Sequence, residues 1–324
     1  MERFIFVTAI VFAVIFGLVA MVGGGRHFHF DVDGRGTDAV MPVSRGHAAA
    51  QTFAGDELQF KYIAAHVTIT PEDRQDISIE IDNPGHVPMP TISADGDRII
   101  VDGHLSGRLH DCSAESADVR GYSTIAIAEM PQIVVHAPRA LHVEYAGAGL
   151  ADIGPTQSLD LDVAGCGGAN AGDVAEALEA NLRGSGQVRT GAAHSANISV
   201  LGSGGLTTGA IADGADVDVL GSGTLTIGSL TGTLKASSHG SGGVNVSAGA
   251  ITTADLDLLG SGGITIAAPV HDLTASIRGS GDVTVNGAVG DVDADILGSG
   301  GVHATSITGT VHKEIHGSGD VTTG

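Results

Sequence analysis

The sequence predicts an all-β fold: a right-handed parallel β-helix (solenoid) of about ten 19-residue Gly-Ser-Gly rungs, preceded by a β-rich N-terminal segment. Two observations carry this prediction. A Gly-Ser-Gly tripeptide recurs at a nearly constant spacing, and apolar and polar residues alternate on both sides of it. The composition agrees, because 42% of the 324 residues are hydrophobic while only 3% are aromatic and none is Trp. A core of Val, Ile, Leu and Ala suits thin and regular layers.

The tripeptide marks one corner of each rung. It begins at Gly184, Gly202, Gly221, Gly240, Gly260, Gly279, Gly298 and Gly317, with intervals of 18 to 20 residues. Two degenerate copies, Gly165-Cys166-Gly167 and Gly147-Ala148-Gly149, extend the series backward. Gly suits such a corner because it adopts positive φ at little cost and lets neighbouring backbones approach closely.

The residues between the corners have the period of two that is typical of β-strands. In the stretch ADVDV, Val217 and Val219 alternate with Asp216 and Asp218, and the same register returns in other rungs. We therefore predict that apolar positions such as Val217 and Ile266 form the core. A calcium-binding nonapeptide solenoid would need half this period, and a helical solenoid would need a period near 3.6 residues.

The N-terminus indicates export. The run from Ile5 to Val22 is almost wholly apolar, so residues 1–22 are expected to be a signal anchor or a signal peptide, and the sequence leaves both open. The rest of the chain would then lie in the cell envelope. An anchor in the inner membrane would place it in the periplasm, whereas a cleaved signal would make it secreted or place it on the outer surface.

Residues 23–51 are predicted to be a flexible linker, because they mix Gly, His and Asp without a sustained hydrophobic period. A metal shared by His27 and His29 beside Asp31 and Asp33 is the alternative.

Residues 52–146 are expected to form the β-rich segment that is continuous with the solenoid repeats of residues 147–324. Within these ranges, Arg108 to Gly121 is polar and is predicted to be a loop. Val174 to Leu182 is more helix-like in sequence, so its rung is expected to bulge.

The net charge of the chain restricts the classes of molecule that it can bind. The formal net charge of −22 makes nucleic acid and anionic membrane surfaces unsuitable partners, and leaves cations, basic proteins and neutral glycans.

Cys112 and Cys166 are the only cysteines. In an exported chain an even pair forms a disulfide, and Cys166 stands where most corners have Ser, so we predict a Cys112–Cys166 bridge.

Three elements of the sequence resemble the head-GIN domain family of auto-transporter adhesins. They are the VTIT strand at 67–70 followed by ISIE at 77–80, the segment IVVHAP at 133–138 followed by LHV at 141–143, and the Gly-Ser-Gly-Asp/Gly-Val-x-Val repeats. The resemblance covers about Thr52 to Gly324. It implies a β-helical, exported protein and no reaction, because the family offers no catalytic residues to carry over.

Paired aspartates are the sharpest candidates for chemistry. Residues i and i+2 of a strand lie about 6.5–7 Å apart on one face, which could suit a hard cation or paired carboxylates in glycoside cleavage. The candidate residues of a weak cation-binding face are Asp216, Asp218, Asp255, Asp257, Asp293 and Asp295, with Asp160 and Asp162 as a further pair. Because the pairs recur at one register, a solvated face is the favoured interpretation. His239, His303, His312 and His316 are interpreted as exposed.

No nucleophile elbow, phosphate loop, zinc spacing or dinucleotide motif is present, so we expect no enzyme, no cofactor and no metal centre. The leading hypothesis is a non-catalytic envelope module that binds an envelope protein or a surface glycan. The rival hypothesis is a polysaccharide-active β-helix enzyme, a lyase or a hydrolase. The final rung at Gly324 carries no capping element, which predicts a homo-oligomer or docking through that rung.

Overall fold

The structure is a computed structural model that describes residues 40–324. The predicted anchor or signal peptide (1–22), and His27 and His29 of the predicted linker, lie outside the described residues. Among residues 40–324, no helix is both long and apolar enough to cross a membrane.

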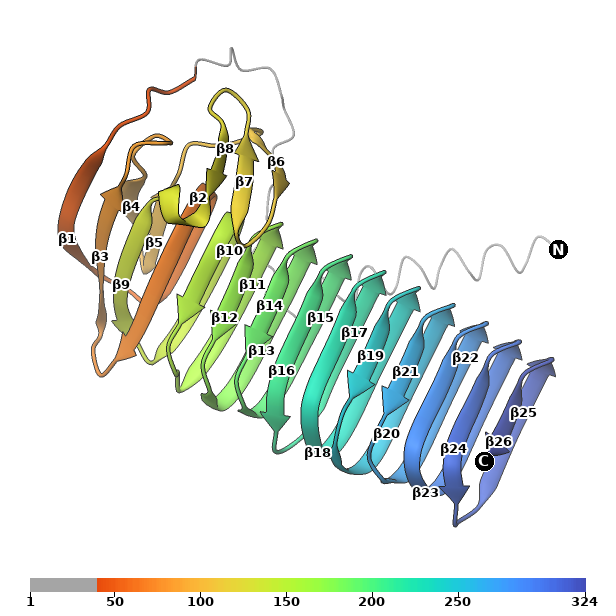
Figure 1. Ribbon diagram of the computed structural model, residues 1–324. Helices are drawn as coiled ribbons and strands as arrows, with labels where there is room; N and C mark the ends of the chain where they lie inside the picture. The colour runs from red at the N-terminus through yellow and green to blue at the C-terminus, as the bar shows by residue number, and fades with distance from the viewer. Residues whose placement is uncertain (1–39) are drawn as a thin grey trace. The chain divides into compact units, whose positions relative to one another are not determined.

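The predicted β-solenoid of about ten rungs is confirmed. Consecutive rungs pair in parallel, and Figure 1 shows their strands stacked from β10 to β26. The strands before the corners are β11 (Ser158–Gly165), β13 (Val174–Gly184), β15 (Ala193–Gly202), β17 (Ala215–Gly221), β20 (Gly249–Gly260), β22 (Val270–Gly279) and β25 (Val311–Gly317). The strands after them are β12 (Gly168–Ala171), β14 (Gln187–Thr190), β16 (Gly205–Ile211), β19 (Gly243–Val246), β21 (Gly263–Ile266), β24 (Gly301–Ile307) and β26 (Asp320–Thr323). Three longer strands cover both positions: β10 (Ala140–Ile153), β18 (Thr224–Gly240) and β23 (Asp282–Gly298).

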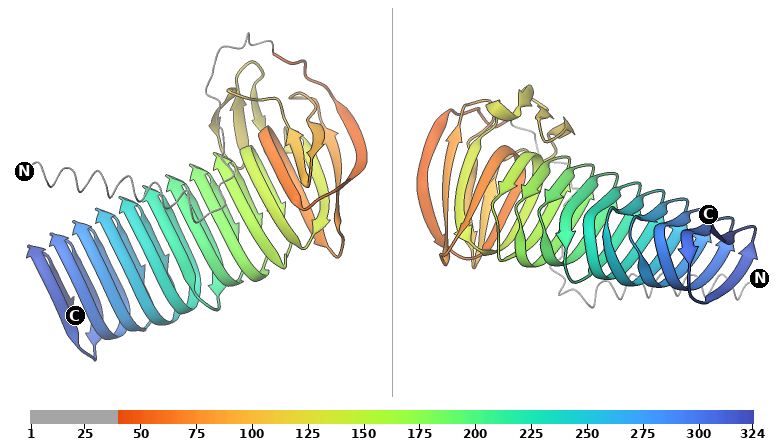
Figure 2. Two further views of the ribbon diagram at one scale, coloured as in Figure 1. Left: turned by 180° about the vertical axis from the view of Figure 1, so that it is seen from behind. Right: turned by 60° about the horizontal axis from the view of Figure 1, so that its bottom comes forward.

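The core lies inside the stack, as the period of two predicts. Val217 and Ile266 are buried, whereas Asp216, which precedes Val217 on the same strand, is exposed. Each inward position stacks on the equivalent residue of the next rung, as Val217 does on Ile198 and Ala236. Figure 2 shows the stacked strands from behind and in a tilted view with the bottom brought forward. Because no rung buries its apolar residues alone, stability is shared between neighbouring rungs.

Each corner brings the backbones of successive rungs together. Gly260 has φ of +127°, and a Cβ at this position would lie 2.3 Å from the carbonyl oxygen of Gly240. That oxygen accepts hydrogen bonds from the backbone N–H groups of Ser261 (2.9 Å) and Gly262 (3.0 Å). A side chain at Gly260 would therefore break the contact that holds one rung on the next.

The N-terminal region, residues 46–153, adds antiparallel strands and aromatic packing to the first rungs. Its elements are β1 (Gly46–Ala54), β2 (Glu57–Glu72), β3 (Asp76–Asn83), β4 (Thr91–Asp95), β5 (Arg98–Asp102), β6 (Leu109–Cys112), β7 (Ser116–Val119), β8 (Thr124–Ala126), the short 3-10 helix η1 (Ile127–Glu129), β9 (Gln132–Pro138) and β10. β3 runs antiparallel to β1 and β9, while β2 pairs in parallel with β10 and so joins the solenoid. Phe60 packs against Tyr145 with ring centroids 6.0 Å apart.

Three local features differ from the sequence predictions. β1 begins at Gly46, inside the range predicted to be a linker. The predicted loop from Arg108 to Gly121 contains β6 and β7, which pair with each other. The helix-like stretch Val174 to Leu182 is strand β13, and the expected bulge appears as a register shift between Val174 and Ala177. Parallel pairing with β11 and β15 on both sides overrides the helical preference of this stretch.

Candidate functional site

The predicted acidic pairs lie on the outer face of the strands that precede the corners. Asp216, Asp218, Asp255, Asp293 and Asp295 are exposed and Asp257 is partly buried. The register separates the pairs by intervening rungs, because Lys235 and Ser237 stand between the pair on β17 and the pair on β20. The structure thus brings the members of each pair to one face and keeps the pairs two rungs, about 9.6 Å, apart.

Basic side chains of neighbouring rungs form ion pairs with two of these aspartates. The Lys235 ammonium lies 3.6 Å from the Asp216 carboxylate, and Arg278 lies 3.4 Å from Asp257. All four side chains are largely exposed, so water and salt screen these pairs and each contributes little to stability. The face therefore has the contacts of a solvated surface, and cation binding by it stays a prediction.

Cys112 and Cys166 form a disulfide, with Cα atoms 5.5 Å apart across 54 residues of sequence. It links the end of β6 to the corner of an early rung. Beside it lies a small second core of apolar residues, which includes Val119, Ile125 and Met130. The bridge thus ties the segment of β6, β7 and β8 to the solenoid.

A cluster of ionisable side chains, the His142 cluster, occupies the outer face at the first rungs. It consists of Glu57, His142, Glu144, Asp160 and Asp162, from β2, β10 and β11. His142 is central to it: its Nδ1 lies 3.4 Å from Asp160, and its Nε2 lies 3.7 Å from Asp162 and 3.9 Å from Glu144. Parallel register explains the convergence, because Glu57, His142 and Asp160 are direct neighbours in adjacent strands.

Other side chains complete the surroundings of this cluster. Arg98 donates to Glu57 and Gln59 donates to Glu144. Arg183 lies 3.6 Å from Asp162. Glu57 and Glu144 are each only 6% exposed, so two carboxylates are withdrawn from water on a face that is otherwise solvated. Partners of opposite charge compensate for that burial.

The cluster shifts the protonation of its members. The nearby Asp162 carboxylate is the main cause that raises the pKa of His142 above its ordinary 6.5, and the charges of Asp160, Glu57 and Glu144 act in the same direction. Burial opposes this effect. Burial is also the main cause that raises the pKa of Asp160 from 3.8 to about 6, although the charge of His142 counteracts it. His142 therefore carries a proton more readily than an exposed histidine does.

One imidazole and several carboxylates are ligand types that bind Zn²⁺ or Mn²⁺. In each of two groups, Glu57–His142–Glu144 and His142–Asp160–Asp162, the ligand atoms lie within 4.8 Å of one another. A protonated His142 satisfies the same carboxylates without a metal. The cluster is thus an ion-pair network whose residues could hold a cation in place of that proton.

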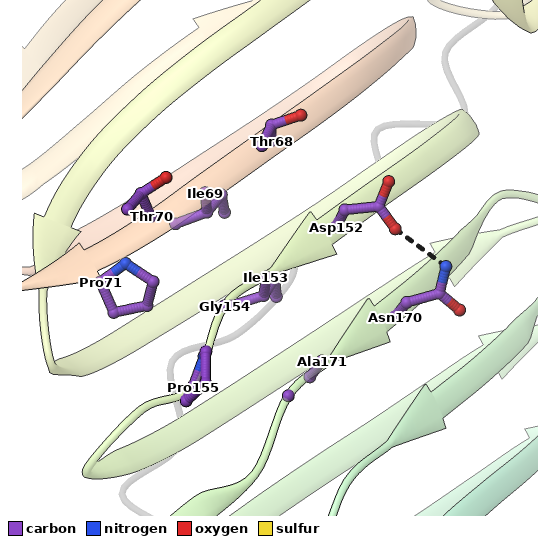
Figure 3. A pocket seen from close by; sticks show the side chains of 11 residues that line it. Thr68, Ile69, Thr70, Pro71, Asp152, Ile153, Gly154, Pro155, Asn170 and Ala171 are labelled. Carbon is purple, nitrogen blue, oxygen red and sulfur yellow. Dashed lines mark hydrogen bonds between the residues drawn. The ribbon is translucent and has the colours of Figure 1, made fainter.

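A shallow depression of the described surface lies where β2, β10 and β12 end. Figure 3 shows it between Thr68 and Pro71 of β2, Asp152 of β10 and Asn170 of β12. Its volume is about 450 Å³, and it is broad and open rather than enclosed. Asn170 donates to Asp152 (2.8 Å), which also contacts His66 (2.8 Å). A small ligand would stay largely exposed here, unlike ligands in most binding pockets.

The predicted histidines stay apart. His303 contacts Thr322 (2.7 Å) and lies 3.8 Å from Asp282, while His312 and His316 are exposed and His239 is partly buried. Sequence reasoning missed the His142 cluster. The sequence does hold a signal for part of it: the alternation at 141–144 (LHVE) returns one rung later at 159–162 (LDLD), which places His142 beside Asp160. Glu57 could not be found that way, because its strand lies far away in sequence.

Comparison with known proteins identifies part of the repeat region. Residues 207–288 match the family model described as "Putative auto-transporter adhesin, head GIN domain". No curated protein matches the chain significantly.

The chain has low similarity to several solved structures. A structure described as a "putative adhesin" from Parabacteroides distasonis is 14% identical, with a TM-score of 0.45, covering 87% of this chain and 99% of its own. A "putative adhesin" from Parabacteroides merdae is 15% identical, with a TM-score of 0.41 and coverages of 85% and 96%. A "Putative lipid binding protein" from P. distasonis is 17% identical, with a TM-score of 0.36 and coverages of 88% and 100%. Similarity at this level assigns no function.

The matched residues run from β16 into β23, through the rungs whose Gly-Ser-Gly motifs carried the resemblance in the sequence. The predicted resemblance to the head-GIN domain family is therefore confirmed, by a direct match over residues 207–288.

Proposed function

We propose that the chain is a non-catalytic, adhesin-like binding module of the cell envelope, which presents the long faces of its solenoid to a partner. The observation that carries this proposal is the regularity of the rungs. From β15 to β25 each strand before a corner pairs residue by residue with its neighbours, through to the corner glycines. An enzyme of this fold needs a cleft, whereas a binding module needs an extended surface.

The rival function, polysaccharide cleavage, would have to use the His142 cluster. Glycoside hydrolysis needs two carboxyl groups on either side of the scissile bond, with space for a sugar between them. Here Asp160 and Asp162 both face the same imidazole, within 3.4 and 3.7 Å, so the space between them is filled. This arrangement favours ion pairing over catalysis.

We further propose that residues 1–22 attach the module to the inner membrane or direct its export, so that its partner is an envelope protein or a surface glycan. The family match supports an envelope role, because that family is described as an adhesin.

A binding screen of the full chain against glycans and envelope proteins tests the proposed function. The expected result is one saturable partner and no release of reducing or unsaturated sugar ends from polysaccharides. Turnover of a polysaccharide that disappears in an Asp160→Asn variant would instead establish the rival. Protease protection tests the compartment. An envelope module should be cleaved in intact cells or once the outer membrane is permeabilised, while the inner membrane is still closed.

A further inference from the structure

Four leucines point outward in a single register column of the repeats. We call this column the leucine ridge: Leu201 on β15, Leu220 on β17, Leu259 on β20 and Leu297 on β23. Their exposed fractions are 36%, 51%, 44% and 55%. His239 and Arg278 occupy the same column in the two intervening rungs. Single exposed leucines are common on soluble proteins, but four in one column require an explanation. Leu201 and Leu220 are direct neighbours, and the other two leucines alternate with His239 and Arg278.

Carboxylates border this line on the same face. Three of the leucines end an Asp-x-Asp-x-Leu sequence, so each has one aspartate two residues before it and another four residues before it. These aspartates are Asp216, Asp218, Asp255, Asp257, Asp293 and Asp295. Asp216 and Asp257 have the exposed ion pairs described above. Among the described residues the other four have no ion-pair partner, so the face presents an apolar line beside uncompensated negative charge.

The spacing along the solenoid axis fits an α-helix. Leu220, Leu259 and Leu297 recur every two rungs, which is about 9.6 Å. Seven residues of an α-helix advance about 10.5 Å, so a helix with one apolar residue per heptad stays nearly in step with three leucines. Cationic residues beside the apolar stripe of such a helix would meet the aspartates.

Other occupants fit this face less well. Glycans stack on aromatic rings, and no Phe, Tyr or Trp follows Tyr145 in the sequence. A second copy would place the same aspartates opposite each other, in a chain whose net charge is −22. Anionic headgroups would meet the same repulsion.

We propose that the leucine ridge and its bordering aspartates are a docking surface for a basic amphipathic helix of a partner protein. The proposal rests on the proposed function as a binding module, and it names the chemical class of the partner. Apolar contact with the leucines supplies affinity, while the aspartates select a cationic partner and speed its approach.

The test uses the full chain and a synthetic helical peptide of three heptads, with Leu along one side and Lys on both flanks. Peptide binding is measured by fluorescence anisotropy at several salt concentrations. We expect that Leu220→Ser, Leu259→Ser and Leu297→Ser together weaken binding by about tenfold or more and leave the salt dependence in place. The combination Asp218→Asn, Asp257→Asn and Asp295→Asn should weaken binding and also reduce the salt dependence.

A matched control separates the docking surface from general charge attraction. Asp213, Asp272 and Asp320 are exposed acids away from the ridge, and their change to Asn removes the same charge. This control should bind the peptide within about twofold of the unchanged protein. Equal loss in this control, or full binding by the leucine variant, would overturn the proposal. A peptide with the same composition but scattered leucines should bind like the leucine variant.

Three further outcomes would assign the ridge to another occupant and reject the proposal. Leucine-dependent pelleting with anionic phospholipid vesicles would indicate a membrane. Leucine-dependent dimers in light scattering would indicate a second copy. Crosslinks from a photoreactive residue at position 259 to residues 1–39 would indicate the chain's own N-terminus. If the screen instead finds a partner that the ridge variants bind normally, this proposal fails while the proposed function stands.

Discussion

The N-terminal region and the repeat region (residues 158–323) are held together by different kinds of contact. The N-terminal region uses antiparallel strands, a disulfide and two large buried rings, Phe60 and Tyr145. The buried Tyr145 hydroxyl donates to the carbonyl oxygens of Ala65 (2.9 Å) and Ala148 (2.6 Å). The buried hydrophobic residues of the repeat region are all aliphatic, and its corners from Gly184 onward share the sequence Gly-Ser-Gly. The N-terminal region is thus stabilised by contacts that occur once, whereas the repeat region is stabilised by the same contacts repeated from rung to rung.

The largest expected effect comes from charge in the repeat core. Val217→Asp or Ile266→Asp would bury a carboxylate without a partner, and we expect each to lower the free energy of unfolding by about 5 kcal/mol. Denaturant unfolding followed by circular dichroism measures this loss. Asp216→Asn on the outer face serves as control and should change stability by less than about 0.5 kcal/mol. Equal losses in all three variants would mean that the alternation does not define the core.

The disulfide should be the next largest contribution, and it links Cys112 of the N-terminal region to Cys166 at the first corner of the repeat region. Closing 54 residues of chain stabilises the folded state by about 4 kcal/mol in the chain-entropy model. Intact-mass analysis of protein produced in the periplasm of an expression host should find no free thiol. A Cys112→Ser, Cys166→Ser variant should gain hydrogen exchange in β6, β7 and β8 and keep its protection in β20 to β23. Loss of protection along the whole stack would show that the two regions unfold as one.

A corner glycine should matter more than the glycine that follows it in the next strand. Gly260→Ala would put a Cβ 2.3 Å from a carbonyl oxygen at φ of +127°, and we expect a loss of about 2–3 kcal/mol. Gly263→Ala is the matched control, because its Cβ would approach only the Asp282 oxygen, at 3.4 Å. Thermal unfolding of both variants measures the difference. Similar melting temperatures would contradict the close contact between corners.

The smallest effect is the pH dependence that the His142 cluster adds at the N-terminal end. The folded state raises the pKa of His142 above 6.5, so the stabilisation from its proton is complete below pH 6.5 and is lost as the pH rises through the raised value. It also raises the pKa of Asp160 from 3.8 to about 6, so stability falls between these values as the pH rises. Both groups therefore make the protein less stable toward neutral and alkaline pH.

Unfolding across pH 4 to 8 checks this sign. His142→Gln should remove the decline above pH 6.5, and Asp160→Asn should remove the decline between about pH 4 and 6. Thr274→Ala, on the same face with no titratable group, should leave both declines in place. A decline that survives in both cluster variants would have to come from other groups.

The same contrast explains what the sequence could predict. The repeated corners and the alternation around them predicted that Val217 and Ile266 are buried, because the same pattern of apolar and polar residues returns in one rung after another. The N-terminal region has no such redundancy. The strands β6 and β7 come from a polar stretch, and Glu57 meets His142 only because β2 pairs with β10. Contacts that depend on a single long-range pairing leave no periodic signal, so the place of Glu57 in the His142 cluster could not be found from the sequence.

The equal length of the rungs has a consequence for how such a chain changes over generations. Duplicating or deleting one 19-residue unit joins two corners of the same geometry, so the stack can shorten or lengthen by about 4.8 Å without rebuilding either neighbour. The outer face is less tolerant, because Asp-x-Asp-x-Leu rungs alternate with rungs that carry Lys235 or Arg278. Losing one intervening unit would place two acidic rungs side by side, whereas losing two adjacent units would keep the alternation. Length variation in steps of two rungs would therefore preserve the surface as well as the core.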